Sequence, residues 1–267
     1  MQVEDDDLAS FEANGALPLP TADADGYVEH NGARIWYAAY GSGPAVILLH
    51  GGLGNAGNWG YQVPALLEAG WTAVVIDSRG HGRSTRDEKP FSYRLMAGDV
   101  LAVLDHLKIE TAPLVGWSDG ACTALILADM HPDRVSGVFF FACNMDPSGT
   151  HEFKPNPVID RCFRRHKRDY EALSATPKMF QTFVADVSHM MQSEPNYSRA
   201  QLAGVRTPVA VVIGEKDEFI RSKHAEYLAH SIPGAELIVF PDVSHFAPLQ
   251  RPETFNREML RFLDRFK

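Results

Sequence analysis

Short apolar segments alternate with longer amphipathic segments along most of the chain. Eight of the apolar segments have the length and residue types of β-strands, and turn residues bound them. They cover residues 27–30, 34–40, 45–50, 72–77, 113–117, 138–143, 209–213 and 237–240. Asn31-Gly32 joins the first two as a typical hairpin turn. Most of the later segments are continuously apolar, which is typical of strands that a parallel sheet buries on both faces.

Helical periodicity occupies several of the intervals between these strands. Apolar residues recur at helical spacing over 95–107, 121–130 and 255–266. This alternation predicts an α/β fold with a mostly parallel eight-stranded sheet flanked by helices. The interval 147–205 has no strand signal and is rich in Met, Phe and Arg. We therefore expect a small helical cap there, inserted after the sixth strand.

The pattern divides the chain into an arm, a core and a cap. We expect the core to comprise residues 26–146 and 206–267, and the cap to comprise 147–205. Residues 1–25 contain seven acidic residues and no basic one, so they predict an irregular acidic arm that aids solubility. The chain of 267 residues has a net charge of −9, and the arm carries most of it. The rest of the chain is nearly neutral.

Composition argues against several classes of protein. A pI near 5.6 opposes nucleic-acid binding, which needs a basic surface. No apolar run approaches the roughly 18–20 residues that span a bilayer, and the first residues do not resemble a secretory signal. Three cysteines are too few for a disulfide framework, and their spacing matches no metal site. We expect a cytoplasmic protein without a membrane or nucleic-acid partner, and composition leaves a homo-oligomer open.

A G-x-S-x-G pentapeptide, GWSDG at 116–120, joins a predicted strand to a predicted helix. This strand–turn–helix setting is that of a nucleophile elbow, in which a serine stands on a tight turn. The helix N-terminus adds positive potential close to a developing oxyanion. We therefore predict that Ser118 is a nucleophile. The alternative is an ordinary serine in a glycine-rich turn.

His245 and Asp217 are the residues that we expect to activate Ser118. A serine hydroxyl needs a base, and His245 follows the last predicted strand, at the carboxyl edge where such sheets bind ligands. Asp217 follows the preceding strand and can fix the tautomer of the imidazole. We expect Glu215 and Glu218 to lie in a solvated loop instead.

Other histidines have structural explanations. His50 and His81 lie in glycine-rich loops, which we expect them to hold by hydrogen bonds. His106 and His224 fall in predicted helices, where we expect them at the surface.

Together these motifs resemble the α/β-hydrolase superfamily. HGG at 50–52, DSRGHGRS at 77–84, GWSDG at 116–120 and the later acid and histidine match it in order. The resemblance covers about residues 26–146 and 206–267. The pentapeptide and the short cap are similar to 3-oxoadipate enol-lactonase-like esterases and to biphenyl-hydrolase-like enzymes, which include valacyclovir hydrolase. Ser118 departs from the aspartate nucleophile of haloalkane dehalogenases and epoxide hydrolases.

This resemblance implies an oxyanion hole and contacts to substrate. The loop at 50–54 and the residue after the nucleophile supply the two donors in this fold, so we assign the backbone N–H groups of Gly52 and Asp119. Leu53 is the alternative to Gly52. The side chains of Leu53, Trp117, Asp119 and Phe246 are candidate substrate contacts.

Two charged features give opposite indications about the substrate. A carboxylate at Asp119 favours a cation, and the matching residue of the valacyclovir-hydrolase group binds the amine of the substrate. The alternative is that Asp119 only bonds neighbouring loops. One face of the predicted cap helix carries Arg161, Arg164, Arg165 and Arg168. This face steers a carboxylate-bearing substrate or is a solvated outer surface.

The sequence therefore predicts a serine hydrolase that cleaves carboxylic esters or lactones of small molecules. Its Ser-His-Asp triad would act through an acyl-enzyme, with no cofactor and no metal. The same triad could instead serve a C–C bond hydrolase or a perhydrolase. A catalytically slow ligand receptor derived from a hydrolase is the alternative from a different class.

Overall fold

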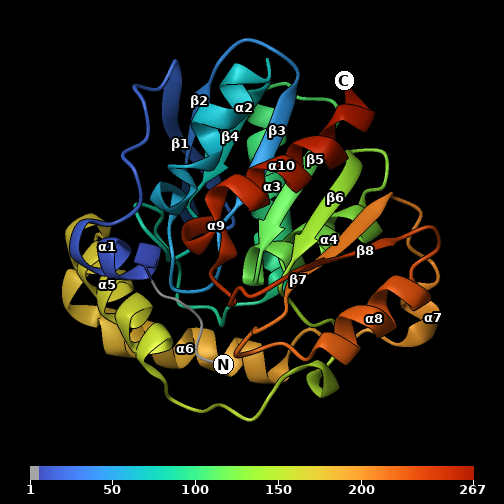
Figure 1. Cartoon of the computed structure of the whole chain (residues 1–267). Coiled ribbons are helices and arrows are strands. Elements are labelled where there is room, and N and C mark those ends of the chain that lie inside the picture. Colours follow the sequence, from blue (N-terminus) through green and yellow to red (C-terminus); the bar gives the residue numbers. More distant parts are fainter. Residues whose placement is uncertain (1–5) are drawn as a thin grey trace.

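The computed structural model describes residues 6–267 and places eight strands in a single sheet (Figure 1). The strands are β1 (Ala24–His30), β2 (Ala33–Tyr40), β3 (Ala45–Leu49), β4 (Thr72–Ile76), β5 (Ala112–Trp117), β6 (Val135–Phe141), β7 (Val209–Gly214) and β8 (Glu236–Phe240). Their order is β1-β2-β4-β3-β5-β6-β7-β8. β2 runs antiparallel to the other seven strands. The predicted mostly parallel eight-stranded sheet is confirmed.

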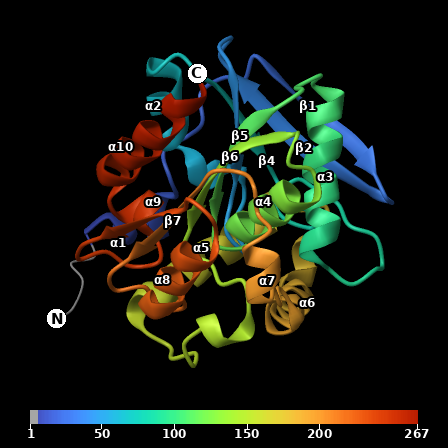
Figure 2. The ribbon, with the colours of Figure 1, turned by 90° about the vertical axis from the view of Figure 1, so that its right-hand side faces the viewer.

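Helices pack against both faces of this sheet. One face is covered by α3 (Tyr93–His106), α4 (Asp119–Met130) and α8 (Ser222–Ser231), and the other by α2 (Gln62–Glu68) and α10 (Pro252–Leu263). Figure 2 shows α3 and α4 on the opposite side of the strands from α2 and α10. In β3, Ile47 packs toward the first layer and Val46 toward the second. Burial on both faces explains the continuous apolar runs.

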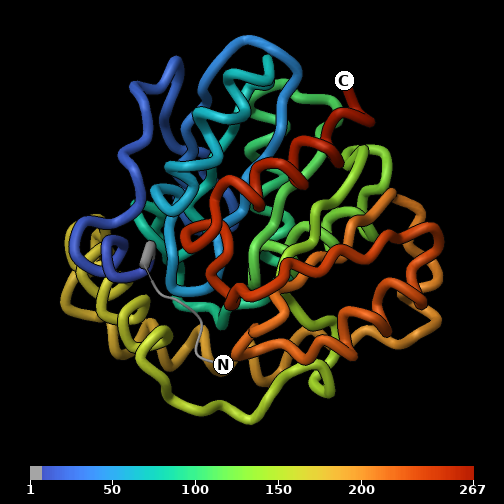
Figure 3. The backbone as a smooth tube through the Cα atoms, viewed as in Figure 1, coloured from blue at the N-terminus to red at the C-terminus, as the bar shows by residue number. Residues whose placement is uncertain are grey.

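The interval between β6 and β7 is helical. It contains η2 (Pro147–Gly149), α5 (Pro157–Leu173), η3 (Pro177–Met179), α6 (Phe180–Ser193) and α7 (Arg199–Leu202). At the start of α5, the side chain of Asn156 caps the N–H of Ile159 and Pro157 occupies the first turn. Figure 3 shows this segment on the side of the sheet away from the C-terminus. In the described part of the chain, no helix is both long and apolar enough to cross a bilayer.

The N-terminal arm is more ordered than its composition suggested. Residues Asp6–Asn14 form α1, which packs on α5 and on α9 (Ala247–Gln250). Leu8 and Phe11, three positions apart on one side of the helix, are 0% and 2% exposed. The expectation of an irregular arm was therefore wrong for this segment, because one apolar face among the acidic residues anchors it.

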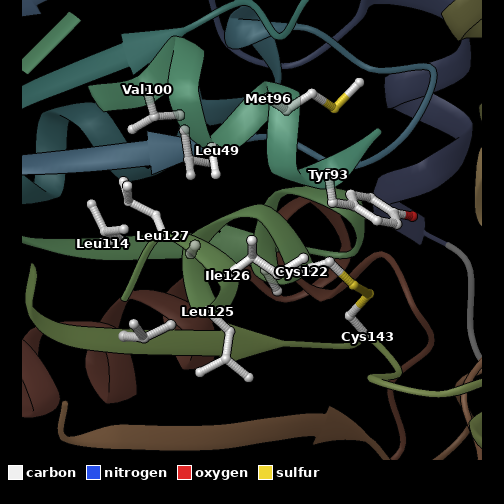
Figure 4. Close-up of a cluster of buried hydrophobic side chains, with 14 of the residues drawn as sticks. Leu49, Tyr93, Met96, Val100, Leu114, Cys122, Leu125, Ile126, Leu127 and Cys143 are labelled. Carbon is white, nitrogen blue, oxygen red and sulfur yellow. A yellow bond between two sulfur atoms is a disulfide. The ribbon is translucent and has the colours of Figure 1, made fainter. Parts of the chain in front are cut away.

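Two of the three cysteines form a disulfide. Cys122 of α4 is bonded to Cys143, which follows β6, within the buried cluster of Figure 4. The count of cysteines correctly excluded a disulfide framework, but it did not predict this single bond. The pairing depends on α4 packing against the end of β6, a contact that the spacing of cysteines does not encode.

Candidate active site

Ser118 stands on a strained turn between β5 and α4. Its φ of 53° and ψ of −124° lie outside the regions that non-glycine residues favour, at a cost on the order of 1–3 kcal/mol. Its N–H donates to the carbonyl of Phe141, at 2.8 Å, and its carbonyl accepts from Ala121, at 2.7 Å. A Cβ on Gly116 would overlap the backbone of Ala121, and one on Gly120 would overlap the carbonyl at the end of β3. Close packing of α4 on the strands therefore requires both glycines.

His245 and Asp217 are in direct contact. Nδ1 of His245 donates to the carboxylate of Asp217, at 2.9 Å from Oδ2 and 3.1 Å from Oδ1. Oδ1 also accepts the backbone N–H groups of Phe219, at 2.9 Å, and Ile220, at 2.8 Å. These bonds fix the carboxylate. With its proton on Nδ1, the imidazole has Nε2 available as a base.

The charge around His245 favours its protonated form. Burial lowers the pKa of His245, but the negative charges of Asp217, Glu218 and Asp119 outweigh burial, and the pKa is raised. The largest of these charge effects comes from Asp217, which also forms the hydrogen bond.

Two further contacts hold the backbone of His245. Its N–H donates to Oε2 of Glu218, at 3.0 Å, and its carbonyl accepts from the indole Nε1 of Trp117, at 2.9 Å. Glu218 is partly buried, so the expectation of a solvated loop was wrong for this residue, whereas Glu215 is exposed. Trp117 is 2% exposed and packs edge-on against Trp59. The buried indole of Trp117 therefore holds the backbone of the His245 loop through a hydrogen bond. The sequence indicated a substrate contact for Trp117 and did not indicate this role.

The glycine loop after β3 lies against the turn of Ser118. A Cβ on Gly51 would lie 3.3 Å from Cβ of Ser118. A Cβ on Gly52 would lie 2.6 Å from Oδ2 of Asp119 and would overlap the methyl group of Met191 on α6. The loop that carries the candidate oxyanion donor thus lies between the turn of Ser118 and α6.

The candidate oxyanion donors have suitable backbone positions. Asp119 is the first residue of α4, so its N–H has no acceptor within the helix. Leu53 takes a left-handed conformation, with φ of 62°, which turns the loop sharply after Gly52. Gly52, Leu53 and Ser118 are partly exposed among buried neighbours. Phe246, by contrast, is 6% exposed and packs edge-on against Trp117.

Asp119 is buried with only one of its oxygens bonded. Oδ1 accepts a 2.7 Å hydrogen bond from the hydroxyl of Tyr93, and Oδ2 has no partner among the residues that the structure describes. Burial raises the pKa of Asp119 to about 6, against the opposing effects of Tyr93 and His245. No local sequence signal marks Tyr93, which stands 26 positions before Asp119.

The structural role predicted for two histidines is confirmed. Nε2 of His50 accepts the N–H of Ser78, at 3.0 Å, and its Nδ1 donates to the carbonyl of Gly51, at 2.8 Å. Nδ1 of His81 donates to the carbonyl of Arg79, at 2.9 Å. Burial lowers the pKa of both imidazoles, to about 3 for His81. Both are therefore neutral at pH 7; His50 connects its loop to that of Ser78, and His81 bonds within its own loop.

The arginine face of α5 contacts the acidic arm. Arg164 bonds the side chain of Glu12, at 2.6 Å, and Arg168 bonds its carbonyl, at 3.1 Å. Arg165 lies 3.5 Å from the carbonyl of Ala13. This face of α5 therefore packs beside the acidic arm, while Arg164 and Arg168 stay exposed to solvent.

The comparisons with known proteins agree with this geometry. Residues 44–188 match the model of the alpha/beta hydrolase fold. The chain belongs to the α/β-hydrolase family. It is similar to serine hydrolase BPHL of Mus musculus, with 28% identity over 263 residues, 94% of this chain and 90% of the relative. It is also 28% identical to a 2-hydroxy-6-oxononadienedioate/2-hydroxy-6-oxononatrienedioate hydrolase of Burkholderia vietnamiensis, over 87% of this chain and 91% of the relative.

One solved structure adds a further likeness. An N-acyl homoserine lactone degrading enzyme, Est816, is 32% identical and superimposes with a TM-score of 0.69, over 88% of this chain and 99% of the other. The relatives are named as hydrolases and match nearly their full length, so this α/β hydrolase is an enzyme of the hydrolase class.

Proposed function

We propose that this α/β hydrolase is a serine hydrolase that cleaves carboxylic esters or lactones of small molecules. The observation that carries the proposal is the 2.9 Å contact between two buried side chains, Asp217 and His245, at the sheet edge where Ser118 stands on its strained turn. The residues on either side of Ser118 both act on His245. Trp117 bonds its carbonyl, and the charge of Asp119 acts on its imidazole.

The proposed reaction proceeds through an acyl-enzyme. Nε2 of His245 takes the proton of Ser118 as the hydroxyl oxygen attacks the carbonyl carbon of the substrate. The backbone N–H groups of Gly52 and Asp119 hold the resulting oxyanion, with Leu53 as the alternative to Gly52. The protonated His245 then gives its proton to the leaving alkoxide. A water molecule, activated by the same imidazole, hydrolyses the acyl-enzyme.

We propose that residues 147–205 are a cap over this site, with 26–146 and 206–267 as the core. Two contacts between these parts support the assignment. The methyl group of Met191 approaches Gly52. The ring of Phe183 lies 4.7 Å from that of His81, edge-on. The cap would then supply apolar walls for the acyl or alcohol part of the substrate.

The negative charge of Asp119 favours the binding of neutral or cationic substrates over that of anionic ones. Its Oδ2 is buried without a partner in the described residues and faces Gly52, so it suits a donor group of a substrate such as an amine. A similarity to the oxononadienedioate hydrolase favours the alternative of a C–C hydrolase. A dianionic substrate, however, would meet repulsion from this carboxylate.

The decisive experiment compares Ser118→Ala with Ser78→Ala in a panel of esters and lactones that vary in acyl length and charge. Ser78 lies in a nearby loop, where its backbone N–H donates to His50 and its carbonyl accepts the N–H of His81. We expect Ser118→Ala to lose at least about 10³-fold in kcat and to escape labelling by a fluorophosphonate, and Ser78→Ala to keep both.

Asp217→Asn should lower kcat by about 10³–10⁴-fold, because the imidazole would take the wrong tautomer. Comparable turnover in Ser118→Ala would refute the proposal. Labelling of Ser118 in the wild-type protein with no turnover of any ester or lactone would favour the ligand-receptor alternative.

A further inference from the structure

His245 is held by two carboxylates. Asp217 bonds the imidazole, and Oε2 of Glu218, the next residue, accepts the backbone N–H of His245 at 3.0 Å. The loop after β7 therefore holds the histidine loop at two points, one on the ring and one on the main chain. The first contact acts on the imidazole itself, and the second limits where the main chain can place the imidazole.

The position of Glu218 is costly for a carboxylate. Burial raises the pKa of Glu218, while the N–H and the charge of His245 oppose that effect. The contact with His245 stabilises the ionised form of this partly buried carboxylate. The charge of Glu218 in turn raises the pKa of His245. The charges of three carboxylates, Asp217, Glu218 and Asp119, raise the pKa of His245, and the ring of Phe219 packs edge-on against the imidazole at 4.7 Å.

We propose that Glu218 is a positioning residue for His245, which fixes the main chain of the catalytic loop and supplies a second negative charge beside the imidazole. This inference rests on the proposed role of His245 as the base. It assigns two separable effects to one side chain. The carboxylate oxygen of Glu218 accepts the N–H of His245 and so holds the loop. The negative charge of Glu218 favours the imidazolium that forms when His245 takes the proton of Ser118.

The same loop offers a matched control. Oε2 of Glu215 accepts the backbone N–H of Asp242, also at 3.0 Å, but Glu215 is exposed and its partner stands three positions before His245. Glu215 is absent from the groups whose charge acts on His245 among the described residues. Substitution of either glutamate by alanine therefore removes a bond from a backbone N–H to a carboxylate. Only the bond of Glu218 is made by His245 itself.

The experiment follows the titration of the His245 imidazole by NMR in Glu218→Gln, Glu218→Ala, Glu215→Gln and Glu215→Ala. The glutamine keeps an acceptor oxygen and removes the charge. We expect Glu218→Gln to lower the titration midpoint of His245 and to move the acid limb of the kcat/KM profile to lower pH by the same amount. Glu218→Ala should also lose about tenfold in kcat/KM at the optimal pH, because the N–H of His245 loses its partner.

The two Glu215 variants should match the wild-type protein in both measurements. A midpoint in Glu218→Gln equal to that in Glu215→Gln would overturn the proposal. The NMR titration is also made in the Ser118→Ala background, which has no proposed nucleophile. A failure of the Glu218 proposal is therefore distinguishable from a failure of the proposed catalytic function.

Discussion

Glu12 of α1 accepts a 2.6 Å hydrogen bond from Arg164 of α5, across 152 positions of sequence. The same helix α1 packs on α9, which begins two residues after His245. The acidic arm thus joins the proposed cap to the loop of the proposed base. Its anchoring depends on two kinds of contact, an exposed ion pair and a buried apolar face, and these should contribute unequally.

Phe11→Ala should destabilise the protein far more than Glu12→Gln. Phe11 is 2% exposed and packs edge-on against His166 of α5, so its truncation should cost about 3 kcal/mol or more. The ion pair of Glu12 is exposed and screened by solvent, so its loss should change the Tm little. Thermal unfolding of both variants measures the difference. Equal Tm values would show that the burial of Phe11 contributes no more to stability than the ion pair of Glu12.

Trp117→Phe should lower kcat/KM through the loop of His245. The substitution removes the 2.9 Å bond from the indole to the carbonyl of His245 and leaves an aromatic ring in the core. We expect a loss of about threefold to tenfold, since a typical hydrogen bond contributes about 0.5–1.5 kcal/mol. Trp59→Phe is the control, because Trp59 is equally buried and its Nε1 has no partner among the described residues. Similar kcat/KM values in the two variants would contradict the anchoring role.

Local pattern predicted the parts of the fold that local interactions determine. The elbow around Ser118 was predictable because a strand, two close glycines and a helix are consecutive in sequence. Asp217 and His245 were predictable because each follows a strand that its apolar residues indicate, and parallel strands end at one sheet edge. Each of these inferences needed only neighbouring residues and the topology.

Other features depend on packing between distant segments and left little local trace. Tyr93 reaches Asp119 only because α3 and α4 pack side by side. His224 was expected at the surface, yet it is 5% exposed and accepts the N–H of Met145 at 3.1 Å. The helix α1 did leave a signal in the spacing of Leu8 and Phe11, but the acidic residues around them favoured the interpretation as an irregular arm.

Asp119→Asn should stabilise the protein at neutral pH. The pKa of Asp119 is raised to about 6 in the folded chain, whereas an unfolded aspartate titrates near 3.9. Between these values the folded state keeps a proton that the unfolded state releases, so stability falls as pH rises through this window. Asparagine does not titrate, and at pH 7 the variant should gain up to about 3 kcal/mol. The difference in Tm between Asp119→Asn and the wild-type protein, measured from pH 4 to 7.5, should grow up to about pH 6 and then level off. A constant difference would contradict the raised pKa.

The ionised form of Asp119 should also give the enzyme a pH-dependent preference for amino esters. Since the pKa of Asp119 is raised to about 6, the carboxylate is mostly charged at pH 7 and mostly neutral at pH 5. We expect the ratio of kcat/KM for an amino ester to that for a neutral ester of the same shape to rise across this range. The ratio cancels the titration of His245, which affects both substrates alike.

Tyr93→Phe tests the same preference for amino esters by removing the hydroxyl that donates a hydrogen bond to Asp119. The hydroxyl of Tyr93 lowers the pKa of Asp119 through its 2.7 Å bond, so its removal should move the rise in the ratio to higher pH. Tyr37→Phe, which removes a hydroxyl that contacts His106 at 3.1 Å, should leave the ratio unchanged at every pH. Asp119→Asn should abolish the rise altogether. A ratio that is independent of pH in the wild-type protein and equal in Asp119→Asn would mean that this carboxylate only bonds Tyr93 and makes no contribution to the choice of substrate.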